Sequence, residues 1–286
     1  MPFQGNLLAV FPYTPSTVDS TTMQRIAREL NLSETTFILP EESSERGTRV
    51  RIFSPTSEME FAGHPTTGTA FVMRRLAIVA ADSQCFVLNE NVGRVPVRID
   101  EGGNPITWLT TPPIEKLAEY PRESCASMLG LGENQLIADV PCELLSAGNP
   151  NSYIAVHNPA IVDEAWLDST ALSQVVSDRT SPTCVFVFAP TKSGAYSRMF
   201  SPQLGIAEDP ATGSATGPLT LFMMKHRLIS SDDGTRFTSE QGVKMGRRSL
   251  IHVQVHGKMG ADGIEVGGQV AEVATATMRL HTPSLA

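Results

Sequence analysis

The chain has 286 residues, of which 41% are apolar and 18% are charged, so it is too hydrophobic and too weakly charged for a disordered protein. Its net charge of −8 argues against nucleic acid or an anionic membrane surface as partner, because both favour a basic face. Four widely separated cysteines without a CxxC pair, no apparent signal peptide and no long apolar span predict a soluble, cytoplasmic protein that needs no disulfides.

The predicted elements begin with a strand and a helix. Ser20 or Thr21 caps the helix, in which Met23, Ile26, Ala27 and Leu30 recur at helical spacing, and it ends near Asn31. Strand patterns occupy residues 7–11, 35–39 and 48–53. From about residue 86 the chain shows repeated short strands separated by Gly or Pro turns. Gly267-Gly268 predicts a hairpin between strands at 264–266 and 269–273.

Two motifs recur in the same order in the two halves of the chain. RIFSP at 51–55 matches RMFSP at 198–202, and HPTTGTA at 64–70 matches DPATGSA at 209–215. The offsets of 147 and 145 residues are close to half of the chain length, far too long for a solenoid repeat. The sequence therefore predicts a duplicated, two-lobed protein, with the Pro-rich segment 111–121 as the crossing between the lobes.

Each copy of the second motif reads as a helix start. Proline at the first helical position, preceded in the second copy by Asp209 as N-cap, is typical of such a start. The first-turn N–H groups and the positive end of the helix dipole form an anion site. Two such starts facing each other across a cleft predict a binding site for a small carboxylate.

His64 and Asp209 take the same position in the two copies of the motif. Either residue alone is more often structural, as a turn histidine or a helix cap. As a pair with different titration behaviour at a symmetric cleft, they suggest general acid–base chemistry. Glu34 follows the first helix, and the residue pattern alone does not separate it from Glu41 or Glu42.

Five segments together resemble one family, the PhzF-like phenazine-biosynthesis isomerases of the diaminopimelate-epimerase fold. They are GN (5–6), MQRIARELNLSETTF (23–37), RIFSP…EMEFAGHPTTGTA (51–70), IAEDPATGSA (206–215) and EQGVKMGR (240–247). The resemblance implies an α+β fold of two similar lobes, each a mixed or antiparallel β-barrel around a central helix. We expect the first lobe at residues 1–112, completed by a C-terminal strand at about 274–286, and the second at 113–273.

The resemblance also implies roles for six residues. Glu34 is then the acid–base residue that moves a proton between two carbons, assisted by His64 and Asp209. Gly63, Gly213 and Ser214 contact the substrate, a dihydro-hydroxyanthranilate in the family reaction. That reaction uses no metal and no organic cofactor, and the family implies a homodimer.

The sequence departs from the family pattern in three places. Gly5-Asn6-Leu7 stands where the family usually has Gly-Asn-Pro, and Gly246-Arg247-Arg248-Ser249 where it has Gly-Arg-Pro-Ser. The strand that precedes the Gly-Asn turn in the family has no counterpart in this sequence. We expect its absence to leave an exposed sheet edge in the first lobe.

Other readings fit the residues less well. A racemase or epimerase on this fold needs two facing thiols, but the candidate positions hold Ala62 and Thr212, and no cysteine lies near either motif in the sequence. Ser214 is not in a G-x-S-x-G motif, and His252 and His256 have no carboxylate beside them to complete a metal site. A protein that binds a small ligand without turnover stays open as the alternative from a different functional class.

Overall fold

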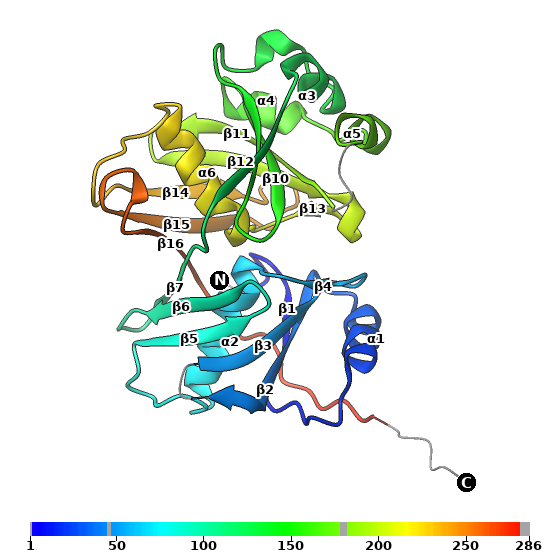
Figure 1. Ribbon diagram of the computed structural model, residues 1–286, viewed down its shortest axis with the longest axis vertical. Helices are drawn as coiled ribbons and strands as arrows, with labels where there is room; N and C mark the ends of the chain where they lie inside the picture. Colours follow the sequence, from blue (N-terminus) through cyan, green and yellow to red (C-terminus); the bar gives the residue numbers. More distant parts are fainter. Residues whose placement is uncertain (1, 45–46, 178–181, 281–286) are drawn as a thin grey trace.

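The computed structural model describes residues 2–44, 47–177 and 182–280, which form two stacked lobes (Figure 1). The first lobe contains β1 (Leu8–Phe11), α1 (Ser20–Leu30), β2 (Glu34–Ser44), β3 (Gly47–Phe53), β4 (Glu58–Met59), α2 (Gly63–Arg75), β5 (Cys85–Glu90), β6 (Gly93–Ile99) and β7 (Ile106–Thr110). The second contains β8 (Glu115–Tyr120), α3 (Arg122–Met128), β9 (Cys142–Ser146), β10 (Pro150–Ala155), α4 (Pro159–Glu164), α5 (Ser169–Val175), β11 (Cys184–Thr191), β12 (Gly194–Ser201), β13 (Ile206–Asp209), α6 (Gly213–Lys225), β14 (Arg236–Gln241), β15 (Ser249–His256) and β16 (Gly263–Gln269).

The same strand pairing occurs in both lobes. In the first lobe β1 runs parallel to β2, β2 antiparallel to β3, β3 parallel to β5, and β6 and β7 follow antiparallel. In the second lobe β10, β11, β12, β14, β15 and β16 repeat this pattern. The predicted duplication is confirmed. An antiparallel pairing of β7 with β16 joins the lobes into one continuous sheet.

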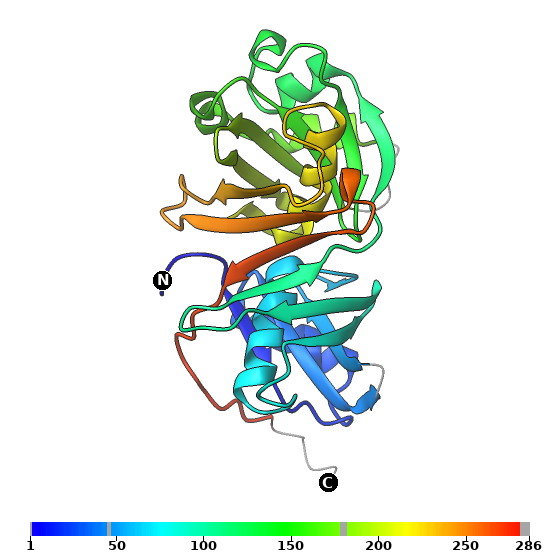
Figure 2. The same cartoon turned by 90° about the vertical axis from the view of Figure 1, so that its left-hand side faces the viewer.

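The strands of each lobe wrap around one central helix (Figure 2). Helix α2 contacts β1, β2, β6, β7 and β16, and α6 contacts β9, β10, β15 and β16. Both helices have 13 residues and are buried on most of their surface, as expected of helices inside a core. The predicted barrel-like wrap around a central helix is therefore confirmed. None of the described helices is both long and apolar enough to cross a lipid bilayer.

Helix α1 lies outside the first barrel, against β2 and β3. The Asp19 side chain caps it by accepting from the backbone N–H of Thr22 at 2.8 Å, where the sequence predicted Ser20 or Thr21 as the cap. The helix ends at Asn31 in a left-handed conformation, as predicted. This sharp end lets the chain turn directly into β2, so that Glu34 becomes the first residue of that strand.

The equivalence predicted for His64 and Asp209 is wrong. Met59 pairs with Ile52 and Asp209 pairs with Met199; since Ile52 and Met199 match in the repeat, Met59 is the counterpart of Asp209. Asp209 ends β13, and Thr212, not Asp209, precedes α6.

Helices α2 and α6 begin at Gly63 and Gly213, which makes Ser214 the counterpart of His64. A longer connection containing a 3₁₀ turn (Pro202–Leu204) separates β12 from β13. This insertion increases the offset between equivalent residues of the two lobes from 147 at β3 and β12 to 150 at the helix starts. The similar letters of HPTTGTA and DPATGSA, in contrast, align at an offset of 145.

The hairpin predicted at Gly267-Gly268 is also wrong, because β16 runs straight through both residues. Gly267 pairs with Trp108 of β7, and a Cβ atom at Gly267 would lie 2.6 Å from the indole ring. This glycine is needed for close approach of the ring rather than for a turn.

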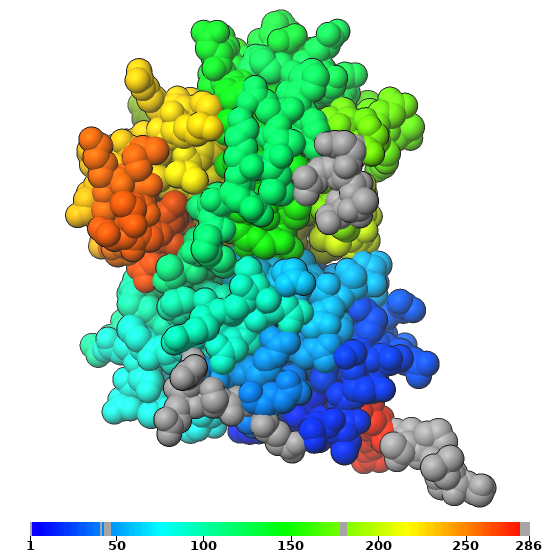
Figure 3. All heavy atoms as spheres, viewed as in Figure 1, coloured from blue at the N-terminus to red at the C-terminus, as the bar shows by residue number. Residues whose placement is uncertain are grey.

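The C-terminal segment returns to the first lobe without forming a strand. Residues 270–280 are extended but unpaired and lie against the first lobe (Figures 2 and 3), where Arg75 Nη1 and Glu272 Oε2 are 2.7 Å apart. The expected strand at about 274–286 is thus absent through residue 280, and its remainder lies outside the described residues. In the second lobe β8 and β9 extend the sheet beyond β10; in the first lobe β1 ends the described strand order.

Replacing Gly267 with alanine should lower the free energy of unfolding by about 1–3 kcal/mol, because the new methyl group overlaps the Trp108 ring. Gly268→Ala is the matched control, since no atom lies within 4 Å of its added Cβ, and it should change stability by less than about 0.5 kcal/mol. Urea unfolding measures both variants. Equal destabilisation by the two variants would contradict this account.

Candidate active site

A cavity of about 30 Å³ lies where the two lobes meet. All six residues predicted for the site line it: Glu34, Gly63, His64, Asp209, Gly213 and Ser214. They come from the two central helices and from the nearby ends of β2 and β13. The structure therefore brings the predicted residues together, although two of them are not equivalent in the way the repeat suggested.

The two central helices meet start to start. A Cβ atom added to Gly63 would lie 2.4 Å from the backbone nitrogen of Ser214 and 2.6 Å from Cα of Gly213, so no larger residue fits there without moving a helix. The first N–H groups of a helix have no acceptor within the helix. Two positive helix ends therefore converge on one cavity, a favourable place for a carboxylate.

Glu34 and His64 form an ion pair in this cavity. His64 Nε2 lies 2.9 Å from Glu34 Oε2 and 3.3 Å from the carbonyl oxygen of Leu7. Glu34 is 5% exposed, and within the described residues its Oε2 accepts no hydrogen bond of good geometry. Apart from His64, this oxygen has no partner among the described residues, so one of its two lone pairs can accept a proton from a ligand.

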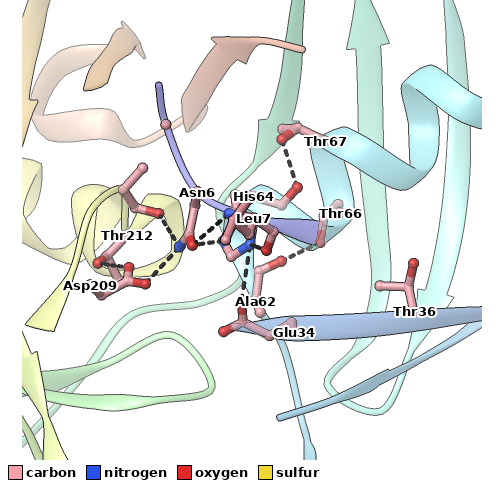
Figure 4. Close-up of polar contacts among 12 residues, drawn as sticks. Asn6, Leu7, Glu34, Thr36, Ala62, His64, Thr66, Thr67, Asp209 and Thr212 are labelled. Atoms are coloured by element: carbon pink, nitrogen blue, oxygen red, sulfur yellow. Dashed lines mark hydrogen bonds and ion pairs between the residues drawn. The ribbon is translucent and has the colours of Figure 1, made fainter. Parts of the chain in front are cut away.

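Asn6 connects the two lobes through its side-chain amide (Figure 4). Its Nδ2 lies 3.1 Å from His64 Nδ1, donates to Asp209 Oδ1 at 2.6 Å and lies 3.3 Å from the carbonyl oxygen of Ala211. An amide donor facing Nδ1 makes that nitrogen an acceptor, so the imidazole proton sits on Nε2, toward Glu34. Asn6 thus fixes the orientation of His64.

Asp209 is held by a second set of contacts in the second lobe. The Thr212 hydroxyl donates to its Oδ2 at 2.5 Å. Gln241 Nε2 donates to the Asp209 carbonyl at 2.6 Å and to the Thr212 hydroxyl oxygen at 2.9 Å, and its Oε1 accepts from the Thr212 N–H at 3.1 Å. A continuous polar chain therefore runs from Gln241 through Asp209 and Asn6 to His64.

Burial and charge shift the pKa values of this chain. Burial by itself lowers the pKa of His64, but the Glu34 carboxylate and, more weakly, Asp209 outweigh it, so the pKa is raised. Burial, reinforced by the negative charge of Glu34, raises the pKa of Asp209, although His64 and the donors Thr212 and Asn6 oppose the rise. Both shifts favour the protonated form of the side chain.

Comparison with known proteins identifies the family. A family model described as phenazine biosynthesis-like protein matches residues 1–276. The chain belongs to this family, which we call the PhzF family.

Relatives extend the match over nearly the whole chain. A trans-2,3-dihydro-3-hydroxyanthranilate isomerase of Pseudomonas aeruginosa is 32% identical over 277 residues, covering 96% of this chain and 93% of the relative. A solved structure from the same species, described as a predicted epimerase, has a TM-score of 0.77 at 30% identity, covering 96% and 95% of the two chains. A PhzF-family structure from Bacillus anthracis gives a TM-score of 0.80 at 23% identity, covering 97% and 95%, which supports the fold. The chain is a PhzF-like isomerase.

Sequence reasoning missed several residues that line the cavity of this PhzF-family protein or orient the side chains in it. Asn6 entered only as part of a motif, and Asn149 and Asn151 were not noticed, yet both line the cavity. Gly148-Asn149-Pro150, at the start of β10, matches Gly5-Asn6-Leu7, just before β1. This third repeat of the duplication was the signal that could have identified them.

One cysteine also lines the cavity, although none lies near the motifs in the sequence. Leu8 pairs with Glu34, and Asn151 pairs with Cys184 in the matching strands of the second lobe, so Cys184 is the counterpart of Glu34. Its thiol lies 3.1 Å from Ser201 Oγ, and burial raises its pKa to about 11. It is therefore a neutral thiol at physiological pH. In the part of the chain that the structure describes, no three His, Cys, Asp or Glu side chains cluster as a metal site.

In the wild-type enzyme the pKa of His64 should lie above the ordinary value for histidine. Glu34→Gln should lower this pKa, because it removes the carboxylate that raises the pKa most while the lowering effect of burial remains. NMR titration of the His64 ring measures both values. Asp209→Asn is the control: it should lower the pKa of His64 by less than Glu34→Gln does, because Asp209 raises that pKa more weakly. An unchanged His64 pKa in Glu34→Gln would contradict the ion pair.

Proposed function

We propose that this PhzF-like isomerase moves a proton within a small cyclic carboxylate by acid–base catalysis, without metal or organic cofactor, and that Glu34 is the acid–base residue. The observation that carries the proposal is the Glu34 carboxylate, nearly buried in the cavity, whose Oε2 has no partner among the described residues apart from the imidazole of His64 and so keeps a free lone pair. A general base needs such a free lone pair in a site that excludes water.

The converging helix starts support the binding step. The N–H groups of Gly63 and His64 on one side, and of Gly213 and Ser214 on the other, are positioned to bind the substrate carboxylate. The same positive ends stabilise the negative charge that spreads into the substrate when a neighbouring C–H bond loses its proton. Binding and charge stabilisation therefore use the same groups.

The proton then stays within the site. Glu34 Oε2 takes the proton from one carbon and becomes a neutral acid, the electron pair shifts along the ring, and Glu34 returns the proton to a second carbon. The N–H at His64 Nε2, 2.9 Å from Glu34 Oε2, stabilises the carboxylate form of Glu34 in this cycle. Asp209 and Asn6 keep His64 in place. Atoms and charge are conserved, so no co-reactant is required.

The site does not favour racemisation by two thiols. Ala62 and Thr212 directly precede the central helices, at the two positions where that chemistry would need cysteine. A single base, Glu34, fits proton transfer between two carbons better than inversion at one carbon, which needs two bases on opposite faces of the substrate.

Incubation in heavy water with trans-2,3-dihydro-3-hydroxyanthranilate and related cyclic carboxylates tests the proposal. The wild type should incorporate deuterium, and Glu34→Gln should lower kcat by about 10²–10⁴-fold, because a positioned base contributes that much. Glu42→Gln, the same change at an exposed residue of β2, should behave as wild type. Ligand-induced stabilisation without deuterium incorporation would instead support a binding protein, and unchanged exchange in Glu34→Gln would remove Glu34 from the mechanism.

We also propose that the enzyme is a homodimer and that it acts in the cytoplasm. The support for the dimer is the resemblance to the PhzF family, and light scattering should give twice the chain mass. A single-chain mass at micromolar concentration would contradict the dimer.

A further inference from the structure

A second glutamate, Glu90, lies in the core of the first lobe below the start of α2. It is the last residue of β5 and is 4% exposed. Its Oε1 lies 2.6 Å from the Thr66 hydroxyl oxygen, and within the described residues its Oε2 has no hydrogen-bond partner. The mechanism proposed above does not use it.

The counterpart of Glu90 in the second lobe is a glutamine. Thr48 and Arg49 of β3 pair with Leu88 and Asn89, and the matching residues of β12 pair with Ser239 and Glu240, so the next residues, Glu90 and Gln241, are equivalent. Gln241 holds the start of α6 through Thr212. Ala62, the residue before α2, has no hydroxyl group, and Glu90 contacts Thr66 one turn further along instead.

The hydrogen bonds around Thr66 favour a protonated Glu90. The Thr66 hydroxyl lies 2.7 Å from the Ala62 carbonyl oxygen (Figure 4), just as Thr216 bonds to Thr212 in the second lobe. If that hydroxyl donates to Ala62, its oxygen is free to accept the proton of a neutral Glu90. A buried carboxylate would instead have a single hydrogen bond for two charged oxygens, which is unfavourable.

We propose that Glu90 is a positioning residue that acts as a neutral carboxylic acid, taking in the first lobe the part that Gln241 takes in the second, and that the active site is competent only while Glu90 keeps its proton. The inference concerns the regulation by pH of the site described under Proposed function and rests on that function for its catalytic readout.

The charged groups around Glu90 agree with this assignment. Burial raises its pKa to about 8, against the lowering effects of the Thr66 hydroxyl and the Arg49 guanidinium. Arg49, on β3, donates to the carbonyl oxygens of Val50 and Asn89 and to Asn91. On β4, Glu58 is paired with Arg51 at 2.5 Å. Arg94, on β6, is exposed, and His64, on α2, is paired with Glu34.

Loss of the proton would act on the site in two ways. The Thr66 hydroxyl would turn from Ala62 to the new carboxylate, which loosens the turn that carries Gly63 and His64. A negative charge one turn inside α2 would also offset the positive helix end that binds the substrate carboxylate. Activity should therefore fall as Glu90 ionises, by about tenfold for each pH unit above its pKa.

The first test needs no substrate. Unfolded glutamate titrates near 4.5 and folded Glu90 near 8, so between these values only the folded protein holds the proton, and the stability that it contributes is lost as pH rises toward 8. The melting temperature of Glu90→Gln relative to wild type should accordingly rise from pH 5 to 8 and level off above. Infrared spectra of the wild type should show a buried carboxylic-acid band that titrates near 8 and is missing in Glu90→Gln. Parallel melting curves and no such band would overturn the proposal.

The second test uses the isomerisation assay. Wild type and Glu115→Gln, which has the same substitution at an exposed residue, should lose kcat/KM above about pH 8, whereas Glu90→Gln should keep it at pH 9. Glu90→Met serves as a second variant in case Glu90→Gln does not fold. Because methionine cannot form the hydrogen bond to Thr66, this variant should have a lower kcat at every pH. Its kcat/KM should also show no loss that titrates near pH 8. An unchanged alkaline loss in both variants would overturn the proposal. If no tested compound is isomerised, the proposed function fails, while the melting and infrared results still decide the state of Glu90.

Discussion

The contact between the starts of α2 and α6 is the constraint on which the structure depends. Gly63 lies so close to Gly213 and Ser214 that an added Cβ atom would overlap the opposing backbone. The helices can approach this closely because glycine has no Cβ atom at the contact, and the pairing of β7 with β16 joins the two sheets that enclose them. Two positive helix ends then meet, and anionic side chains or ligands are the natural means of balancing them.

Duplication supplies two equal frameworks, but equivalent positions carry different chemistry. The counterpart pairs are Glu34 and Cys184, Met59 and Asp209, His64 and Ser214, and Glu90 and Gln241. In each lobe the backbone around the helix start is kept, while the ionisable groups are distributed between the lobes. The result is a site with the Glu34 carboxylate, paired within the described residues only with His64, on the first-lobe side and the Asp209 carboxylate, held by Asn6 and Thr212, on the other.

Much of this organisation could be predicted from the residues, because the repeat RIFSP/RMFSP covers the ends of the matching strands β3 and β12. The sequence failed where similar letters align in a different register from the backbone. HPTTG places its proline inside α2, whereas DPATG places its proline before α6. Gly267-Gly268 misled for a related reason, since local turn preference cannot show that a Trp108 ring from another strand approaches Gly267. Asn6 is a long-range bridge to His64 and Asp209, which no local pattern specifies.

The distribution of protons explains why such an asymmetric site suits transfer between two carbons. The Glu34 carboxylate and, more weakly, Asp209 raise the pKa of His64 against the effect of burial, and burial, reinforced by the charge of Glu34, raises the pKa of Asp209. Both shifts act to limit the negative charge of the cavity. Glu34 Oε2 lies beside His64 Nε2 and, in the proposed mechanism, opposite the helix ends that stabilise an anionic intermediate. Because the counterpart of Glu34 is a neutral thiol, Cys184, a second base of equal strength does not face it. In the proposed mechanism, a proton taken by Glu34 is therefore most readily returned by Glu34, to another carbon on the same face of the substrate.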